Sequence, residues 1–173
     1  GAEVGFSAWV VYYLQSKLGY KPVIASGGLS IVWIGLMVGR FANALLAKKF
    51  SSKLLVSTAG IGGLAAGLIF LGLESLYAVY PCLFIIGLCM SGIFPNVMAE
   101  INSREPERAG TVTGIMTMGA GAGAMIFQWF VGFIAERTTI TVGLIAPAVL
   151  MGLLVISYFI ALIPKKPIAA ETG

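Results

Sequence analysis

Six apolar runs, separated by short polar segments, constrain this sequence more than any other feature. They cover residues 1–16, 23–47, 54–73, 75–99, 109–135 and 138–163, and a polar tail follows at 164–173. A helix crosses the roughly 30 Å hydrocarbon core of a bilayer with about 20 apolar residues. The strands of a membrane barrel would instead alternate polar and apolar residues over about ten positions. We therefore expect an all-α polytopic membrane bundle of six transmembrane helices, forming a single domain over residues 1–173.

The composition agrees with a membrane environment. Hydrophobic residues make up 58% of the chain and charged residues only 10%, whereas a soluble chain is about 25% charged. The net charge of +4 does not indicate nucleic-acid binding, because the basic residues flank the apolar runs instead of forming one patch. We expect an integral protein of the lipid bilayer with no nucleic-acid partner.

The basic residues also set the orientation of the bundle. Short connections make neighbouring spans alternate in direction, so the loops divide between two sides of the membrane. One side has Lys17, Lys21 and Arg137, and the other has Arg40, Lys48, Lys49, Lys53, Arg104, Arg108, Lys165 and Lys166. By the positive-inside rule the second side is cytoplasmic. We expect the C-terminus on the cytoplasmic side of the cell (inner) membrane.

Glycines four residues apart recur along the spans. The pairs are Gly1 and Gly5, Gly35 and Gly39, Gly63 and Gly67, Gly110 and Gly114, and Gly119 and Gly123. Small residues at this spacing let helix backbones approach closely in lipid. We expect tight helix packing at these positions, a feature that says little about activity.

Four of the six runs carry a strongly polar side chain within the apolar stretch. These are Glu3, Asn43, Asn96 and Gln128, whereas the third and sixth runs have only hydroxyl groups. Polar side chains at membrane depth are costly unless they are paired or hydrated, so they mark functional positions by default. We expect the first, second, fourth and fifth spans to surround a hydrated cavity, with the other two as peripheral supports.

The candidate solute-binding residues lie on three of these four spans. Trp9 and Tyr13 are one turn apart on the first span, and aromatic rings of this kind stack on the apolar faces of sugar-like solutes. The fourth span contributes Asn96, and the fifth contributes Thr117 and Gln128 on a face of small residues. Structural alternatives stay open, namely an interfacial position for the tyrosine, a packing kink at the proline beside Asn96, and a helix–helix seam on the fifth span.

Two further sets of charges have candidate roles. Glu3 is the one carboxylate with a chance of lying deep in the membrane, where a proton carrier coupled to solute movement would be placed. Arg40, Glu100, Arg104 and Arg108 flank the second, fourth and fifth spans on the side assigned to the cytoplasm. Charges there would lock the helix ends in one conformation and separate in another. Ordinary solvated flanking charges are the alternative.

Metal and enzyme chemistry have little support. The sequence has no histidine and two cysteines, seven residues apart in one apolar run, so a four-ligand metal set is lacking. There is also no acid pair at membrane depth and no convincing set of nucleophile and base. We expect no metal, no cofactor and no enzymatic activity.

Three features together carry a resemblance to a known family. They are the six spans, the loop segment GRFANALLAKKF at residues 39–50, and the glycine-rich fifth span. They look like one six-helix half of a major facilitator superfamily transporter. The opening segment GAEVGFSAW, with Tyr12, Tyr13 and Leu14 after it, is similar to the seventh helix of the fucose–galactose–glucose proton symporter branch. The loop lacks the acidic residue that is usual in the superfamily motif.

The resemblance implies two pseudo-symmetric halves that expose a central solute site to each side of the membrane in turn. It implies that this chain is the C-terminal half, that its partner is the missing N-terminal half, and that the transported solute is a sugar or related metabolite, coupled to protons. The short first run and the absent initiator methionine fit a truncated sequence. A natural half-size protein that homodimerises is the alternative, and a non-transporting membrane solute sensor or assembly subunit also stays open.

Overall fold

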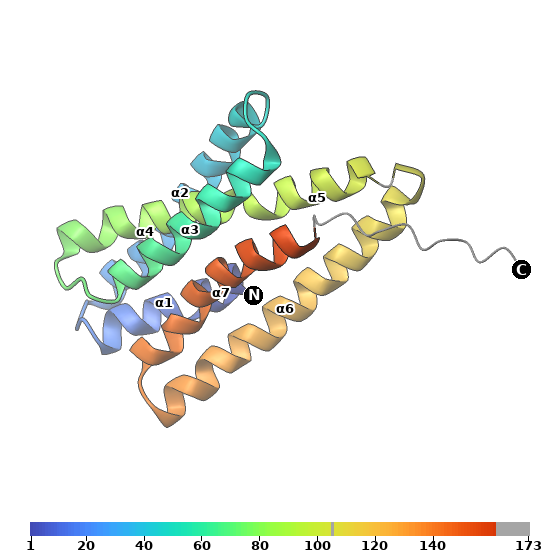
Figure 1. The fold of residues 1–173 in the computed structure, drawn as a ribbon. Helices are drawn as coiled ribbons and strands as arrows, with labels where there is room; N and C mark the ends of the chain where they lie inside the picture. Colours follow the sequence, from blue (N-terminus) through green and yellow to red (C-terminus); the bar gives the residue numbers. More distant parts are fainter. Residues whose placement is uncertain (105, 162–173) are drawn as a thin grey trace, which may run out of the picture.

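A computed structural model describes residues 1–104 and 106–161, and within these residues every regular element is a helix (Figure 1). The helices are α1 Ala2–Ser16, α2 Pro22–Leu46, α3 Ser52–Phe70, α4 Leu76–Ser91, α5 Ile93–Arg104, the 3-10 helix η1 Pro106–Arg108, α6 Ala109–Arg137 and α7 Ile140–Ala161. Among the described residues, five helical stretches are long and apolar enough to cross a membrane, with α4 and α5 forming one stretch. The predicted all-α membrane bundle is therefore confirmed.

The bundle has two ends, which are named here by a residue at each. The Lys17 end, at the left of Figure 1, carries the connections at residues 17–21, 71–75 and 138–139. The Arg104 end carries the connection at 47–51 and the residues 106–108 that precede α6. The expected polar tail at 164–173, with Lys165 and Lys166, lies outside the described residues.

Several helix bounds differ from those expected. α1 has 15 residues and spans about 22 Å at 1.5 Å per residue, which is less than a hydrocarbon core. α5 continues past residue 99, where the fourth span was expected to end, and stops at Arg104. Charged residues four apart support a helix instead of ending it, and Glu100 and Arg104 have this spacing.

The fourth span is broken at Gly92, between α4 and α5. Pro95 has no N–H to donate to the carbonyl of Ser91, and its ring crowds that carbonyl. Asn96 restores bonding at the break, because its backbone N–H and its side-chain Nδ2 both donate to the Gly92 carbonyl, at 3.1 and 2.8 Å. The span therefore consists of two segments joined by one bonded turn.

Glycine permits the closest helix contacts. A Cβ on Gly35 of α2 would collide with the carbonyl of Phe84, and one on Gly87 of α4 would collide with the carbonyl of Val32. α2 and α4 therefore meet backbone to backbone near their middles. On α3, added Cβ atoms at Gly63 and Gly67 would collide with side chains of α7. The predicted pairs Gly35/Gly39 and Gly63/Gly67 therefore both lie at helix contacts.

α6 is packed differently. Its buried residues are Val131 and Gly132, both close to the Lys17 end. Within the described residues, a Cβ on Gly110, Gly114 or Gly119 would have no atom within 4 Å. The predicted pair Gly110 and Gly114 is therefore not matched by a helix contact inside this bundle. In the pair Gly119 and Gly123, Gly123 alone lies beside the start of α1, with an added Cβ 3.5 Å from the backbone nitrogen of Gly1.

Candidate functional site

Trp9 joins α1 to α6. Its indole Nε1 donates to the backbone carbonyl of Gln128 at 2.9 Å, and its ring lies so close to Gly132 that a Cβ there would be 2.6 Å from the ring carbon Cζ2. The structure thus brings together two of the residues predicted to bind solute. The contact uses the backbone of Gln128, whose side chain is exposed.

Tyr13 joins α1 to the connection between α3 and α4. Its side chain is completely buried, its ring centroid lies 5.1 Å from that of Phe70, and its hydroxyl donates to the carbonyl of Leu71 at 3.2 Å. Tyr20 donates to the carbonyl of Glu74 in the same connection at 2.8 Å. Two tyrosine hydroxyls therefore hold residues 71–75 in place.

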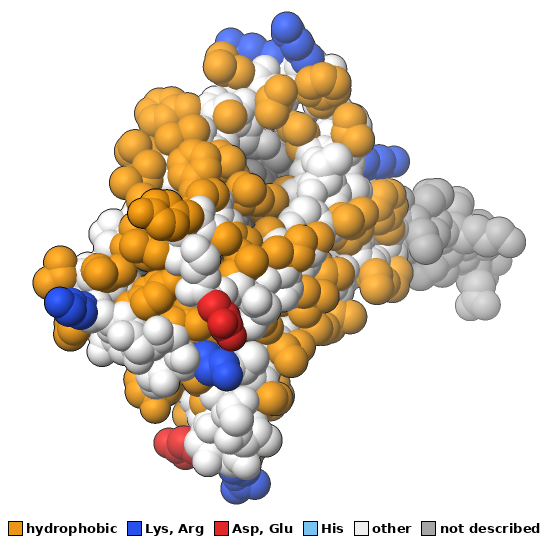
Figure 2. Space-filling model, turned by 90° about the vertical axis from the view of Figure 1, so that its left-hand side faces the viewer, with side chains coloured by type: hydrophobic (Ala, Val, Ile, Leu, Met, Phe, Trp, Pro, Cys, Tyr) orange, Lys and Arg blue, Asp and Glu red, His pale blue; other side chains and the backbone are white. Residues whose placement is uncertain are grey.

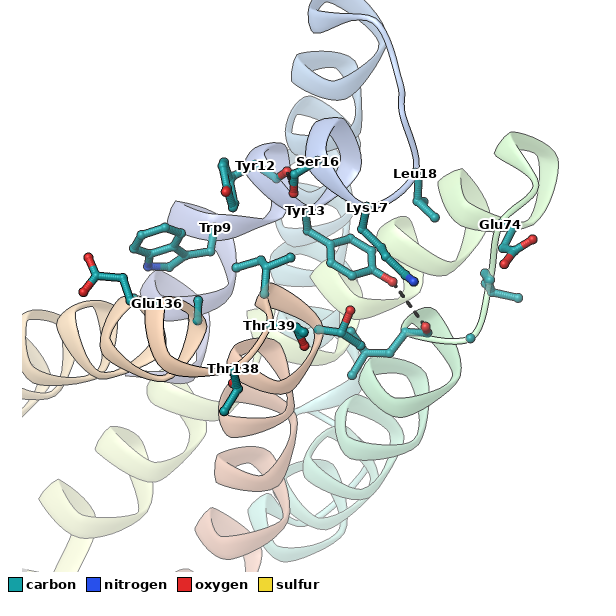
Figure 3. A pocket seen from close by; sticks show the side chains of 17 residues that line it. Trp9, Tyr12, Tyr13, Ser16, Lys17, Leu18, Glu74, Glu136, Thr138 and Thr139 are labelled. Atoms are coloured by element: carbon teal, nitrogen blue, oxygen red, sulfur yellow. Dashed lines mark hydrogen bonds between the residues drawn. The ribbon is translucent and has the colours of Figure 1, made fainter.

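A pocket of about 910 Å³ lies at the Lys17 end, between α1, this connection and the corner from α6 to α7 (Figure 3). The polar and aromatic side chains that line it are Trp9, Tyr12, Tyr13, Ser16, Lys17, Glu74, Glu136, Thr138, Thr139 and Thr141. Figure 3 shows Trp9 beside Glu136 on one side of the pocket and Lys17 beside Tyr13 on the other. Figure 2, which looks onto this end, shows few charged side chains among many hydrophobic ones.

A second cavity, of about 790 Å³, lies towards the Arg104 end between α1, α5, α6 and α7. Glu3 and Arg104 contribute charged groups to it, and most of the remaining lining side chains are apolar. Tyr158 also lines this cavity, and its buried hydroxyl has no hydrogen-bond partner among the described residues. The two cavities thus separate Trp9 and Tyr13 from Glu3.

Asn96 lies apart from both cavities. Its side chain is 4% exposed, and its Nδ2 donates to Oδ1 of Asn43 at 2.8 Å as well as to the Gly92 carbonyl. A Cβ on Gly92 would lie 2.6 Å from Oδ1 of Asn43. Asn96 therefore ties α2 to the break between α4 and α5.

Thr117 lies on the exposed side of α6. Its hydroxyl donates to the carbonyl of Thr113 one turn earlier, at 2.8 Å. Thr113 in turn pairs with Asn102, whose Nδ2 donates to its hydroxyl at 3.0 Å, and this bond links α6 to α5. The structure does not bring Thr117 together with the other predicted solute-binding side chains.

The four charged side chains predicted to form a gate do not form one network among the described residues. Arg104 and Glu100 form an ion pair at 2.9 Å, one turn apart on α5. Between the described residues, no ion pair connects Arg40 or Arg108 to it.

Sequence reasoning missed several pocket residues. Glu74, Glu136 and Thr139 were not among the predicted site residues, although they line the pocket with Trp9. A signal was present in the sequence, because Glu136 and Arg137 separate two apolar runs and Thr138 and Thr139 open the second one, so that four polar residues follow one another. Polar clusters at a span boundary are common at any membrane surface, so that signal alone did not distinguish a pocket.

The helical spans, the polar side chains bonded between them and the cavities towards either end define a polytopic integral membrane protein. The model of the Major Facilitator Superfamily matches residues 2–172. The chain therefore belongs to the Major Facilitator Superfamily, whose members carry solutes across membranes. A search of curated proteins finds no match.

Proposed function

We propose that this chain supplies six helices of a transporter that moves a small polar solute, a sugar or related metabolite, by alternating access. The observation that carries the proposal is the exposed face of α6. Gly114, Thr117, Gly121 and Gln128 share this face and are all exposed. A lipid-facing helix surface is usually covered by large apolar side chains, whereas a face with glycine, a hydroxyl and an amide suits a hydrated path.

The other wall of this path is a second six-helix bundle. In a transporter of this architecture the solute site lies between two bundles that rock against each other. The exposed small-residue face of α6 supports such a neighbour, either the N-terminal half of the same transporter or a second copy. An antibody against the connection between α6 and α7 would distinguish them in native membranes, since the first arrangement predicts a band of about twice the 18.1 kDa mass and the second a band at that mass.

The predicted solute-binding residues take two roles in this proposal. Thr117 and Gln128 contact the solute from the α6 face, because both side chains are exposed there. Tyr13 and Asn96 are buried with their polar atoms bonded to other helices or connections, which supports a role in holding the walls of the path. Trp9 belongs to the pocket at the Lys17 end.

Glu3 is the proton-coupling group of the proposal. It lines the cavity towards the Arg104 end and is only partly buried. A carboxylate in a cavity that is alternately open and closed can take up a proton on one side and release it on the other. By the positive-inside rule the Arg104 end faces the cytoplasm of the cell.

The test is uptake of radiolabelled monosaccharides into liposomes that contain the intact protein. An inward proton gradient should drive uphill uptake in the native protein, and Glu3→Gln should abolish it while leaving exchange partly intact. Glu107→Gln, at an exposed position in η1, serves as the matched control and should accumulate solute normally. Unchanged uphill uptake in Glu3→Gln would remove Glu3 from the mechanism, and absence of uptake for every sugar would contradict the proposed solute.

A further inference from the structure

The pocket at the Lys17 end has walls that are fixed before any ligand arrives. The Tyr13 and Tyr20 hydroxyls hold the connection at 71–75, and the Thr138 hydroxyl donates to the carbonyl of Ile134 at 2.7 Å. Thr139 accepts a hydrogen bond from the backbone N–H of Val142 at 3.3 Å. A preformed pocket loses less entropy on binding than a mobile one.

The apolar surface of the pocket is aromatic. The N–H of the Trp9 ring already donates to the carbonyl of Gln128. Trp9 can therefore contact a ligand through the apolar surface of its ring, but not through a hydrogen bond. Tyr12 meets Trp9 edge to face, with ring centroids 6.0 Å apart, and is 54% exposed at the rim. Such ring faces pack against the C–H groups of a sugar ring.

The polar groups of the pocket can both donate and accept hydrogen bonds. The Lys17 ammonium only donates, and the ionised carboxylates of Glu74 and Glu136 only accept. Thr139 accepts from Val142 and so keeps its own proton to donate, whereas Thr138 has used its proton and keeps a lone pair. Ligand hydroxyl groups, each of which is donor and acceptor, match this mixture.

The charged side chains of the pocket further restrict the class of ligand that can bind there. Between the described residues, no ion pair engages Lys17, Glu74 or Glu136, so these groups are not neutralised by a partner within 4 Å. An anionic ligand would meet two carboxylates, and a cationic ligand would meet the ammonium of Lys17. A neutral ligand with several hydroxyl groups meets no like charge at any of these three side chains.

We propose that this pocket is a capture site for a neutral polyhydroxy solute, distinct from the α6 face that lines the central path. Its volume of about 910 Å³ lies within the roughly 300–1,000 Å³ of small-molecule sites. The proposal rests on the proposed transport function and adds a site where the solute binds before it reaches the path. Tyr12 lines the rim of the pocket and is exposed there, so it is accessible to an arriving solute.

Trp9 provides a direct reporter of binding. This sequence has three tryptophans, so Trp33→Phe/Trp129→Phe leaves Trp9 as its sole indole, and any tryptophan of the second six-helix bundle is replaced by phenylalanine in the same background. We expect D-glucose to change the Trp9 fluorescence of the purified intact protein saturably. D-glucosamine and D-glucuronate keep the ring but add a positive or a negative charge, and we expect both to bind at least fivefold more weakly. An equal response to either charged analogue would overturn the assignment to a neutral ligand.

Two threonine variants separate the pocket from the central path. In the single-tryptophan background, Thr139→Val should weaken the D-glucose response of Trp9 at least fivefold, whereas Thr117→Val on α6 should leave the response intact and impair uptake. The opposite pattern would mean that Trp9 senses binding in the central path, and the capture site would be wrong. Glu136→Gln tests the same wall if Thr139→Val does not fold, and it should also weaken the response.

The outcomes of these experiments distinguish a failure of the capture-site proposal from a failure of the transport proposal. If Thr139→Val and Glu136→Gln both take up solute with an unchanged half-saturation concentration and an unchanged Trp9 response, the capture site is overturned while transport stands. If the native protein takes up no sugar but Trp9 still responds to D-glucose, the transport proposal fails and the pocket stands as a binding site.

Discussion

The two ends of the bundle are joined in different ways. At the Lys17 end, hydroxyl groups of Tyr13, Tyr20 and Tyr80 donate to backbone carbonyls of other elements, at 3.2, 2.8 and 2.7 Å. Trp9 adds a fourth bond of this kind. Towards the Arg104 end, the cross-helix bonds of the described residues join side chain to side chain, from Asn96 to Asn43 and between Asn102 and Thr113.

The two kinds of hydrogen bond differ in how firmly they fix the helices at each end. A backbone carbonyl is fixed by its helix or turn, so a bond to it fixes the position of a whole element. A bond between two side chains breaks when either one changes its rotamer, and the Glu100–Arg104 ion pair lies within one helix. We infer that the Lys17 end moves as a unit and that helix movements are easier at the Arg104 end.

The largest expected effect tests the Trp9 contact. Gly132→Val should lower the free energy of unfolding by about 3 kcal/mol, because the new side chain overlaps the indole ring and forces it to move. The control is Gly110→Val on the same helix, where an added Cβ has no described atom within 4 Å, and its change should be below about 0.5 kcal/mol. Thermal unfolding in detergent measures both, and equal losses would contradict the contact.

The polar bond between α2 and α5 comes next. Asn96→Ala and Asn43→Ala should each cost about 1–2 kcal/mol, because each leaves the other amide, buried at Asn96 and partly buried at Asn43, short of a partner. The double variant should lose less than the sum of the two single variants. A coupling free energy of about 1 kcal/mol is expected from such bonds in membrane proteins, and strict additivity would show that the bond is absent in solution.

Removing the hydroxyl group of one buried tyrosine at each end compares the two ends directly. Tyr13→Phe removes a hydroxyl that donates to Leu71 and should cost about 1 kcal/mol. Tyr158→Phe removes a buried hydroxyl with no partner among the described residues, so it should be neutral or slightly stabilising. Amide hydrogen exchange of residues 71–75 should accelerate in the first variant alone, and equal exchange in both would remove the proposed difference between the ends.

The smallest effect is expected for the ion pair on α5. Glu100→Gln should change stability by less than about 0.5 kcal/mol, because the Arg104 side chain is 45% exposed and exposed pairs one turn apart contribute little. Unfolding measured in 1 M salt should give the same small difference between variant and native protein. A larger loss would mean that Glu100 bonds across helices when the whole transporter is assembled.

Much of the fold could be predicted from the sequence because its determinants are local. Runs of apolar residues predict the spans, and Pro95, three residues after Gly92, predicts a disturbed helix where the structure has its break. The pair Gly35 and Gly39 predicts a close contact that α4 provides. These features depend on bonding within one helix or on the size of one residue.

The sequence predicts a cavity but not the side chains that line it, because the lining depends on which face of each helix turns inward. A span that is apolar all round carries no stripe to show its buried side, so Tyr13 could not be distinguished from an interfacial tyrosine. The contact between Trp9 and Gly132 joins residues 123 positions apart, and neither residue indicates the other. The gate between helices stays a prediction, since in this structure Glu100 and Arg104 pair with each other within α5.

The fit between Trp9 and Gly132 has a consequence for how this sequence can change over evolutionary time. The ring occupies the space that any side chain at position 132 would need, so the two positions share one fixed volume. A relative with a larger residue at 132 must therefore carry a smaller one at 9, and a chain that passes through a mismatched intermediate loses stability on the way. Covariation between these two positions in an alignment would record that shared volume.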